Sequence, residues 1–322
     1  VEVLSDIEGL IPLIQSILND KVSEFQQWDR LNKVKEDYRD KTGNVYSKEV
    51  IEVPIEVIKT LLTQMLEVLK TGIAKAKVMG GGVLPSYFIN EVTDYEVTGQ
   101  KTHYGLDGVK VKAFSHRALP LFLEAPARYM KTLTGEEAKE LHTSVTASNI
   151  YDRTLGMYKT SESLDSESME IGRIRAFTPG WLERESVFLH MTYKYLLSLL
   201  SAGLYEDFYE AIQTNMIPFL DPAVYGRPTT ENSSFIASSV NPNPAVIGQG
   251  FVARLSGSTA EAISMWVKMF VGNKGFEVHS GQLEFHFAPK LSSEFFDVKG
   301  EVKIKLFATT EVIYVNVSRK AT

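Results

Sequence analysis

The feature that most constrains the fold is a change in the spacing of apolar residues near Gly272. Before this residue, apolar side chains recur every three or four positions, as in residues 7–18 and 57–69, which is typical of amphipathic helices. After it, the segments QLEFHF, EVKIKLF and EVIYVNV alternate with period two, which is typical of half-buried antiparallel strands. The sequence therefore predicts a mainly α body at 1–271 and a small antiparallel β module at 272–322.

Within the body, residues 29–48 are charged and are expected to form a loop, and Gly80-Gly81-Gly82 opens a stretch of short strands. The apolar spacing predicts further helices at 121–131, 135–148, 183–200, 205–215 and 258–270. The segment 218–250 is rich in Pro, Gly, Asn and Ser and is too long for a simple connector. Long loops of this kind are usually functional or disordered, and its apolar residues favour packing: Phe219, Leu220, Phe235 and Ile236.

Composition excludes several classes of protein. Lys and Arg number 34 against 40 Asp and Glu, so the net charge of -6 argues against a nucleic-acid partner, which needs a basic surface. The absence of Cys removes disulfide scaffolds and thiolate chemistry and is compatible with a cytoplasmic location. No apolar run approaches the roughly 20 residues that span a bilayer, and the N-terminus lacks the pattern of a signal peptide. Because the chain begins inside a helical pattern, we expect a piece of a longer polypeptide.

Few residues are candidates for chemistry on spacing alone. The six His residues are scattered and no HExxH or GxSxG motif occurs, so neither a metal cofactor nor a serine hydrolase is predicted. The turn Ser256-Gly257-Ser258-Thr259 has two interpretations, either a helix N-cap or an anion site at a helix N-terminus. His190 lies among apolar residues, which is more typical of a core histidine than of a ligand.

Three blocks resemble the cellobiose, chitobiose and laminaribiose phosphorylases. Residues 178–190, TPGWLERESVFLH, are similar to the PPGxxENGGxFxH stretch of that family. Residues 231–235, ENSSF, stand where the family has its EPY segment, and residues 248–260, GQGFVARLSGSTA, resemble GRGGWxWYTGTAG. The residues of these blocks are most similar to those of the related β-glucan and oligosaccharide phosphorylases, and the resemblance is strongest over about 172–271.

This resemblance implies part of an (α/α)6 barrel, or toroid, followed by a β-sandwich-type module. It also implies inverting phosphorolysis, in which inorganic phosphate is a co-substrate and attacks a β-glucoside or β-glucan oligosaccharide to give α-glucose 1-phosphate. An inverting hydrolase needs a second carboxylate to activate water, whereas phosphate is already an anionic nucleophile. On the family pattern, His190, Ser256 and Gly257 bind phosphate and Glu183 contacts the acceptor sugar. No organic cofactor is implied, and a homodimer is an open alternative.

The sequence departs from the family where Leu182 replaces a Lys and Arg184-Glu185-Ser186 replaces Asn-Gly-Gly. The family's general acid is an Asp in a WND-type segment, which we expect upstream of Val1, so no catalytic acid is assigned within the chain and Asp6 is not favoured. Two other functions remain open. One is a glycoside hydrolase on the same toroid, and the other is a non-catalytic carbohydrate-binding or structural protein with Trp181 and Tyr225 as sugar platforms.

Overall fold

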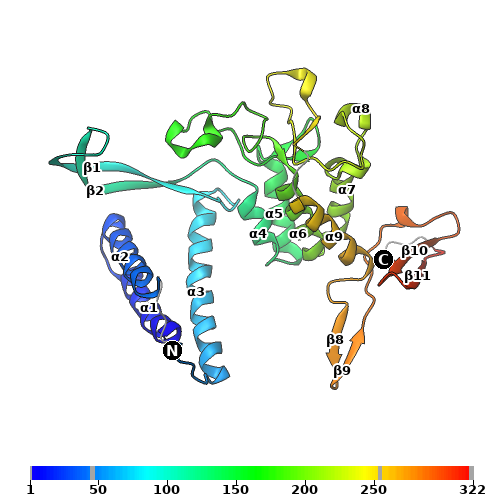
Figure 1. Ribbon diagram of the computed structural model, residues 1–322, viewed down its shortest axis with the longest axis horizontal. Coiled ribbons are helices and arrows are strands. Elements are labelled where there is room, and N and C mark those ends of the chain that lie inside the picture. Colours follow the sequence, from blue (N-terminus) through cyan, green and yellow to red (C-terminus); the bar gives the residue numbers. More distant parts are fainter. Residues whose placement is uncertain (1, 44–47, 253–255, 319–322) are drawn as a thin grey trace. The chain divides into compact units, whose positions relative to one another are not determined.

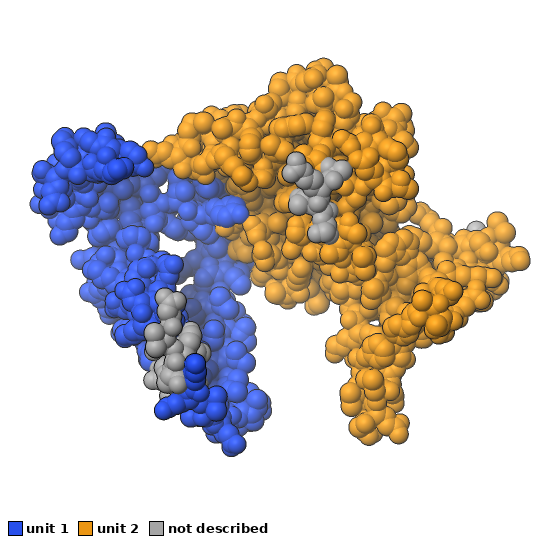
Figure 2. All heavy atoms as spheres, viewed as in Figure 1, with its two compact units in different colours: residues 1–81, 87–119 blue, residues 82–86, 120–322 orange. Residues whose placement is uncertain are grey.

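The computed structural model describes residues 2–43, 48–252 and 256–318 (Figure 1). The chain divides into two compact units, which Figure 2 colours separately. Unit 1 comprises residues 1–81 and 87–119, and unit 2 comprises residues 82–86 and 120–322. Within the described residues, no helix is both long and apolar enough to cross a membrane.

The described residues of unit 1 form the helices α1 (Glu2–Asn19), α2 (Glu24–Thr42) and α3 (Ile55–Met79). A long antiparallel hairpin, β1 (Phe88–Lys101) with β2 (Asp107–Ala118), completes it. The charged stretch expected to be a loop from residue 29 is instead most of α2. Ser23 and Gln26 form a capping box at its start, and the ion pair of Lys33 Nζ with Asp29 Oδ2 at 2.6 Å spans one turn.

Unit 2 is built around α6 (Leu189–Ala202), which packs against α4 (Glu124–Met130), α7 (Tyr205–Asn215) and α9 (Ser256–Phe270). Helix α5 (Gly135–Ala147) and the single turn α8 (Pro222–Tyr225) also belong to this unit. Most side chains of α6 are buried, which is the pattern of a helix enclosed by its neighbours. Short 3₁₀ turns lie at Met169–Ile171, Arg173–Arg175, Ile217–Phe219, Pro244–Val246 and Ser293–Phe295.

A small three-stranded sheet joins segments of unit 2 that are distant in the sequence. Strand β5 (Val187–Phe188) pairs with β6 (Phe235–Ile236), which pairs with β7 (Gly250–Phe251), both antiparallel. The stacked rings of Phe188 and Phe235, with centroids 4.8 Å apart, support it. The long segment 218–250 is therefore packed at its apolar residues Phe235 and Ile236, both buried.

The remaining strands form separate two-stranded sheets. Strand β3 (Tyr151–Asp152) pairs with β4 (Met157–Tyr158) in the segment between α5 and α6. After α9, β8 (Phe276–His279) pairs with β9 (Gln282–Phe285), and β10 (Glu301–Leu306) pairs with β11 (Thr310–Val315). The period-two segments of the sequence thus form hairpins, as their alternation indicates.

The expectation of a mainly α (α/α)6 barrel is wrong. The described residues form a mixed arrangement of helices and several small antiparallel sheets rather than a clear ring of paired helices. Apolar spacing identifies helical segments but does not determine how helices pair, and short strands such as β5 carry too few residues to show a period. The helix expected at 183–200 begins only at Leu189, because Leu182 and Glu185 adopt φ of +50° and +55°, which no α-helix accommodates.

Shortening a buried side chain of α6 should lower the free energy of unfolding, whereas shortening an exposed side chain should change it little. Leu199 is fully buried, whereas Leu283 is 69% exposed. We expect Leu199→Ala to lower the free energy of unfolding by about 2–5 kcal/mol through lost burial and a residual cavity. The matched variant Leu283→Ala should change it by no more than about 0.5 kcal/mol. Urea denaturation followed by circular dichroism measures both, and equal effects would contradict the position of α6 in the core.

Candidate functional site

The candidate site lies where the first turns of α6 and α9 meet. Strand β5 runs directly into α6, so His190 is the second residue of that helix, and Gly257 is the second residue of α9. A Cβ atom on Gly257 would lie 2.7 Å from both Cε1 and Nδ1 of the His190 ring. A glycine is therefore required for this close approach. The structure thus brings together two residues that are far apart in the sequence, while the side chain of Ser256 lies outside the described residues.

Two charged residues complete this cluster, each one helical turn further along. Lys194 follows His190 on α6 and Glu261 follows Gly257 on α9, so each shares a helix face with its predecessor. Glu261 Oε1 lies 3.8 Å from His190 Nε2 and 3.5 Å from Lys194 Nζ. The three side chains are 32%, 24% and 16% exposed for His190, Lys194 and Glu261 respectively. All three side chains are thus partly buried and keep some access to solvent.

The protonation of His190 follows from these neighbours. Burial lowers the pKa of His190, and the ammonium of Lys194 lowers it further, whereas the carboxylate of Glu261 acts in the opposite direction. The pKa of His190 lies below its usual value of 6.5, so the imidazole is mainly neutral at pH 7. A neutral imidazole donates one hydrogen bond and accepts another. The backbone N–H groups of the first turn of α9 add donors and a partial positive charge.

The segment that resembles the family's EPY block also reaches this helix start. Asn232 Nδ2 donates to Ser258 Oγ at 2.5 Å and to Thr259 Oγ1 at 3.3 Å. Ser258 is completely buried. The amide of Asn232 therefore fixes the hydroxyl groups of the first turn of α9, so the turn Ser256–Thr259 is held by a tertiary contact as well as by its own backbone.

Glu183 lies apart from this cluster. It stands at the tip of a tight turn in which Trp181 and Arg184 exchange backbone hydrogen bonds of 3.2 Å. Its Oε1 is 3.3 Å from Arg173 Nη2, and its side chain is one-third exposed. Within the described residues, no contact joins Glu183 to His190 or Gly257. The structure therefore brings together only part of the set that the resemblance implies.

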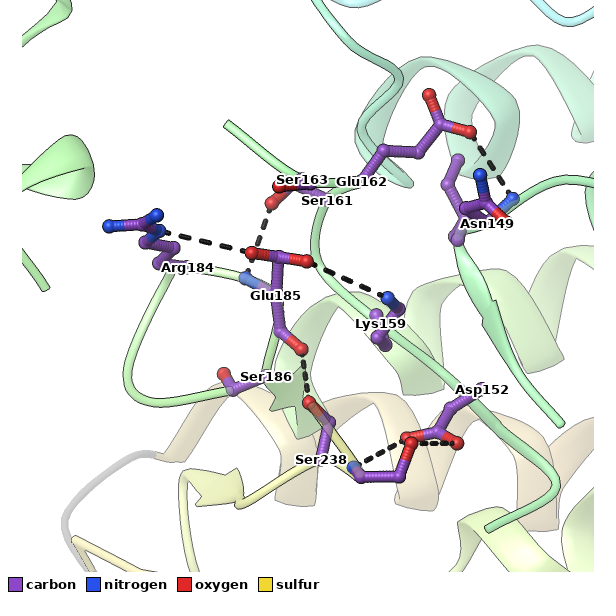
Figure 3. A network of polar contacts seen from close by, with 12 residues as sticks. Asn149, Asp152, Lys159, Ser161, Glu162, Ser163, Arg184, Glu185, Ser186 and Ser238 are labelled. Carbon is purple, nitrogen blue, oxygen red and sulfur yellow. Dashed lines mark hydrogen bonds and ion pairs between the residues drawn. The ribbon is translucent and has the colours of Figure 1, made fainter. Parts of the chain in front are cut away.

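The residues after Glu183 are buried instead of capping a helix. Arg184 donates to the carbonyl oxygens of Arg175 and Phe177 at 2.7 and 2.8 Å and pairs with Asp165. Arg184 therefore precedes α6 and organises a loop. Glu185 is held in its left-handed conformation by hydrogen bonds of its backbone: its N–H donates to Ser161 Oγ, and its carbonyl accepts from Ser238 Oγ (Figure 3).

A polar pocket of about 290 Å³ lies beside this network. Within the described residues, neither Lys159 Nζ nor the Glu185 carboxylate makes a hydrogen bond, although their side chains are only 7% and 6% exposed. They lie 4.0 Å apart, and Arg184 Nε, also unpartnered, is 3.8 Å from the carboxylate (Figure 3). Burial raises the pKa of Glu185 in spite of both cations. Most of the residues that line the pocket have polar side chains: Asn149, Tyr151, Asp152, Arg153, Thr154, Lys159, Ser163, Glu185, Ser239 and Val240.

Asp152 is the rigid part of that lining. Its carboxylate accepts hydrogen bonds from the backbone N–H and the hydroxyl of Ser239, both at 2.8 Å, and from the N–H groups of Thr154 and Leu155. Lys159 and Glu185 differ, because their charged atoms keep unused hydrogen-bonding capacity. Their charged groups contact each other only as an ion pair, so a polar ligand in the pocket could add the hydrogen bonds that this pair lacks.

The proposed aromatic sugar platforms do not fit the structure equally. Tyr225 is buried, and its hydroxyl is bound to the Glu231 carbonyl and to Ser233, so its ring face is not available to a sugar. Trp181 is packed edge-on against Phe251, with ring centroids 4.2 Å apart. The prediction that a sugar stacks on the ring of Tyr225 is therefore wrong.

The sequence alone did not indicate the charged residues at the helix starts or in the pocket. Lys194 and Glu261 had a usable signal, since each follows a predicted residue by four positions on a helix. Lys159 and Glu185 had no such signal beyond the replacement of Gly by Glu185 in the motif that the chain resembles, because 26 positions separate them.

No protein-family model and no curated protein matches the chain. The function is therefore inferred from these residues and their geometry.

The electrostatics of the cluster can be tested at His190. We expect its imidazole to titrate below 6.5 in an NMR pH titration, with His190→Gln used to assign the signal. Lys194→Met removes a nearby cation and should raise the pKa of His190. Glu261→Gln removes the carboxylate that favours the imidazolium form and should lower it further. Shifts in the same direction for both variants would contradict the arrangement of the three groups.

Proposed function

We propose that the chain is part of a glycoside phosphorylase that acts on a β-glucoside or β-glucan oligosaccharide. One observation carries the proposal: Gly257, at the start of α9, lies against the ring of His190, with Lys194 one turn away. These are the residue types and the helix terminus that an anion needs. The likeness of residues 178–190 and 248–260 to the phosphorylase motifs supports the identity of that anion as inorganic phosphate.

In the proposed reaction, a phosphate oxygen attacks the anomeric carbon while the bond to the leaving sugar oxygen breaks. The leaving oxygen takes a proton from a general acid, which we expect upstream of Val1. The first-turn N–H groups of α9, one N–H of His190 and the ammonium of Lys194 would bind the phosphate oxygens. Glu261 would keep Lys194 and His190 in place, and the nucleophile needs no base because it is already an anion.

The polar pocket is proposed to bind a sugar unit of the substrate. Hydroxyl groups both donate and accept hydrogen bonds, so they can satisfy the ammonium of Lys159 and the carboxylate of Glu185 together. The ring of Tyr151 offers an apolar face in the same lining. The volume of about 290 Å³ is at the lower end for ligand pockets, which suits one small polar unit. Glu183 keeps its proposed role at the acceptor sugar, since its side chain is partly exposed.

Two alternatives give different binding behaviour. A glycoside hydrolase would bind the sugar but show no specific need for phosphate. A non-catalytic carbohydrate-binding protein would do the same, and the second candidate draws support from the polar pocket, which does not involve His190. Phosphate binding is therefore the property that separates the proposal from both.

Phosphate binding should depend on the helix-start cluster. We expect His190→Ala, Lys194→Met and Gly257→Ala each to weaken binding of inorganic phosphate, measured by calorimetry. A charge-assisted hydrogen bond is worth about 1.5–3 kcal/mol, which corresponds to about one to two decades in affinity. Gly257→Ala acts by placing a methyl group against the His190 ring. Lys268→Met, in the last turn of the same helix, is the matched control and should leave phosphate affinity unchanged.

The polar pocket provides the reciprocal test. Lys159→Met should weaken binding of short β-glucan oligosaccharides while phosphate affinity stays the same, and Lys194→Met should do the reverse. Saccharide binding without measurable phosphate binding by the unmodified chain would favour the carbohydrate-binding alternative over a phosphorylase. Parallel loss of both ligands in both variants, with a lowered melting temperature, would indicate unfolding and contradict two separate sites.

A further inference from the structure

The hairpin β8–β9 carries four potential metal ligands on one face. Side chains alternate across a strand, so Glu277 and His279 share a face of β8, opposite to that of Phe276 and Val278. On the partner strand, Glu284 lies directly opposite Glu277 in the antiparallel register. His286 follows at the next position on that face, where its N–H donates to the carbonyl of Gly275 at 2.7 Å.

The side chains on this face converge. One potential ligand atom from each of Glu277, His279 and His286 lies within 4.8 Å of the other two. The rings of His279 and His286 have centroids 5.1 Å apart, and His279 Nε2 is 3.3 Å from Glu277 Oε2. Neither the chain spacing nor a helix face predicts this group, because only strand pairing brings residues 279 and 286 together.

Two features of the cluster are unfavourable without a cation. Glu277 and Glu284 are like charges directly opposite each other on adjacent strands, an arrangement that destabilises a sheet. In addition, Nε2 of His286 is shielded from solvent and makes no hydrogen bond, although Glu284 Oε2 lies 3.1 Å away. That pair is in contact without the alignment of a hydrogen bond. Glu277 has two partners, since its Oε1 lies 3.5 Å from Lys274 Nζ and its Oε2 is hydrogen-bonded to His279 Nε2.

We propose that Glu277, His279 and His286 bind a divalent transition-metal ion of the zinc type. Two imidazole nitrogens and one carboxylate are a ligand set that zinc accepts, with bonds of about 2.0–2.2 Å and a fourth position left open. The side chains are 33%, 54% and 43% exposed for Glu277, His279 and His286, so they can rotate to close the widest gap. Glu284 or water completes the coordination.

The metal ion would stabilise the hairpin by linking β8 to β9. On the opposite face, Phe276 and Phe285 pack together at 4.7 Å between centroids and both contact Phe307, at 6.0 and 5.7 Å. The strands are thus held at their base by aromatic contacts, whereas Val278 and Leu283 near the turn are each 69% exposed. An ion that links β8 to β9 on the polar face would restrain this exposed end. This site is independent of the proposed phosphorolysis.

The proposal is tested by titrating the untagged 322-residue chain with Zn²⁺ in a calorimeter and with Co²⁺ or Cu²⁺ followed by visible absorption. We expect one ion per chain and ligand-field bands that report imidazole coordination. His279→Ala and His286→Ala should each weaken Zn²⁺ binding at least about tenfold, since even loss of an outer-shell partner costs about 10- to 100-fold. Glu277→Gln, which keeps the size of the side chain, should also weaken it.

Variants of a histidine outside the cluster serve as the control. His103, in the turn after β1, is not part of this group, and His103→Ala should bind Zn²⁺ as the unmodified chain does. Circular dichroism establishes that each variant is folded. Absence of Zn²⁺ binding below millimolar concentration would overturn the proposal. So would an equal loss in His103→Ala, or unchanged affinity in folded Glu277→Gln together with folded His279→Ala.

Discussion

The burial of α6 is the constraint on which the architecture of unit 2 depends. Its buried side chains face α4, α7 and α9, and even its buried polar residues make hydrogen bonds within the protein. The hydroxyl of Tyr195 lies 2.9 Å from His142 Nδ1, and that of Tyr193 accepts the N–H of Ile217 at 3.1 Å. Burial raises the pKa of Tyr193 to about 12, so both hydroxyls remain neutral hydrogen-bonding groups. A helix so enclosed has a fixed position in unit 2, and the chain segment before it must approach the first residue of α6 from a defined direction.

That direction is set by the small sheet β5–β6–β7. Because β5 leads into α6, and β7 precedes α9, pairing of both strands with β6 brings the starts of the two helices together. Burial of one helix and pairing of six strand residues thus place His190 against Gly257. The binding cluster is a consequence of core packing, and Lys194 and Glu261 add charge that the same two helices carry on their facing turns.

Incomplete pairing of charge distinguishes three places in unit 2. Lys159 and Glu185 are buried, and their charged groups lie 4.0 Å apart without a hydrogen bond. Glu261 is shared between His190 and Lys194, while Glu277 faces Glu284 across a strand pair. Asp152 shows the other extreme, since its carboxylate is tied to backbone groups and organises a loop. We propose ligands at charges of the first kind, because a polar group with unused hydrogen-bonding capacity can still bind one.

The sequence by itself determined which segments are helices and hairpins where the period is long, as in α3, α9 and the alternating strands after Gly272. It also indicated His190 and Gly257, through local motifs. It failed for α2, whose stability comes from a cap and charge pairs instead of an apolar stripe, and for the start of α6, where left-handed residues end the loop. Only the tertiary structure decided the helix arrangement, the polar pocket and the His279–His286 pair. Periodicity is a property of neighbours along the chain, whereas these features depend on contacts between residues far apart in it, such as Lys159 with Glu185.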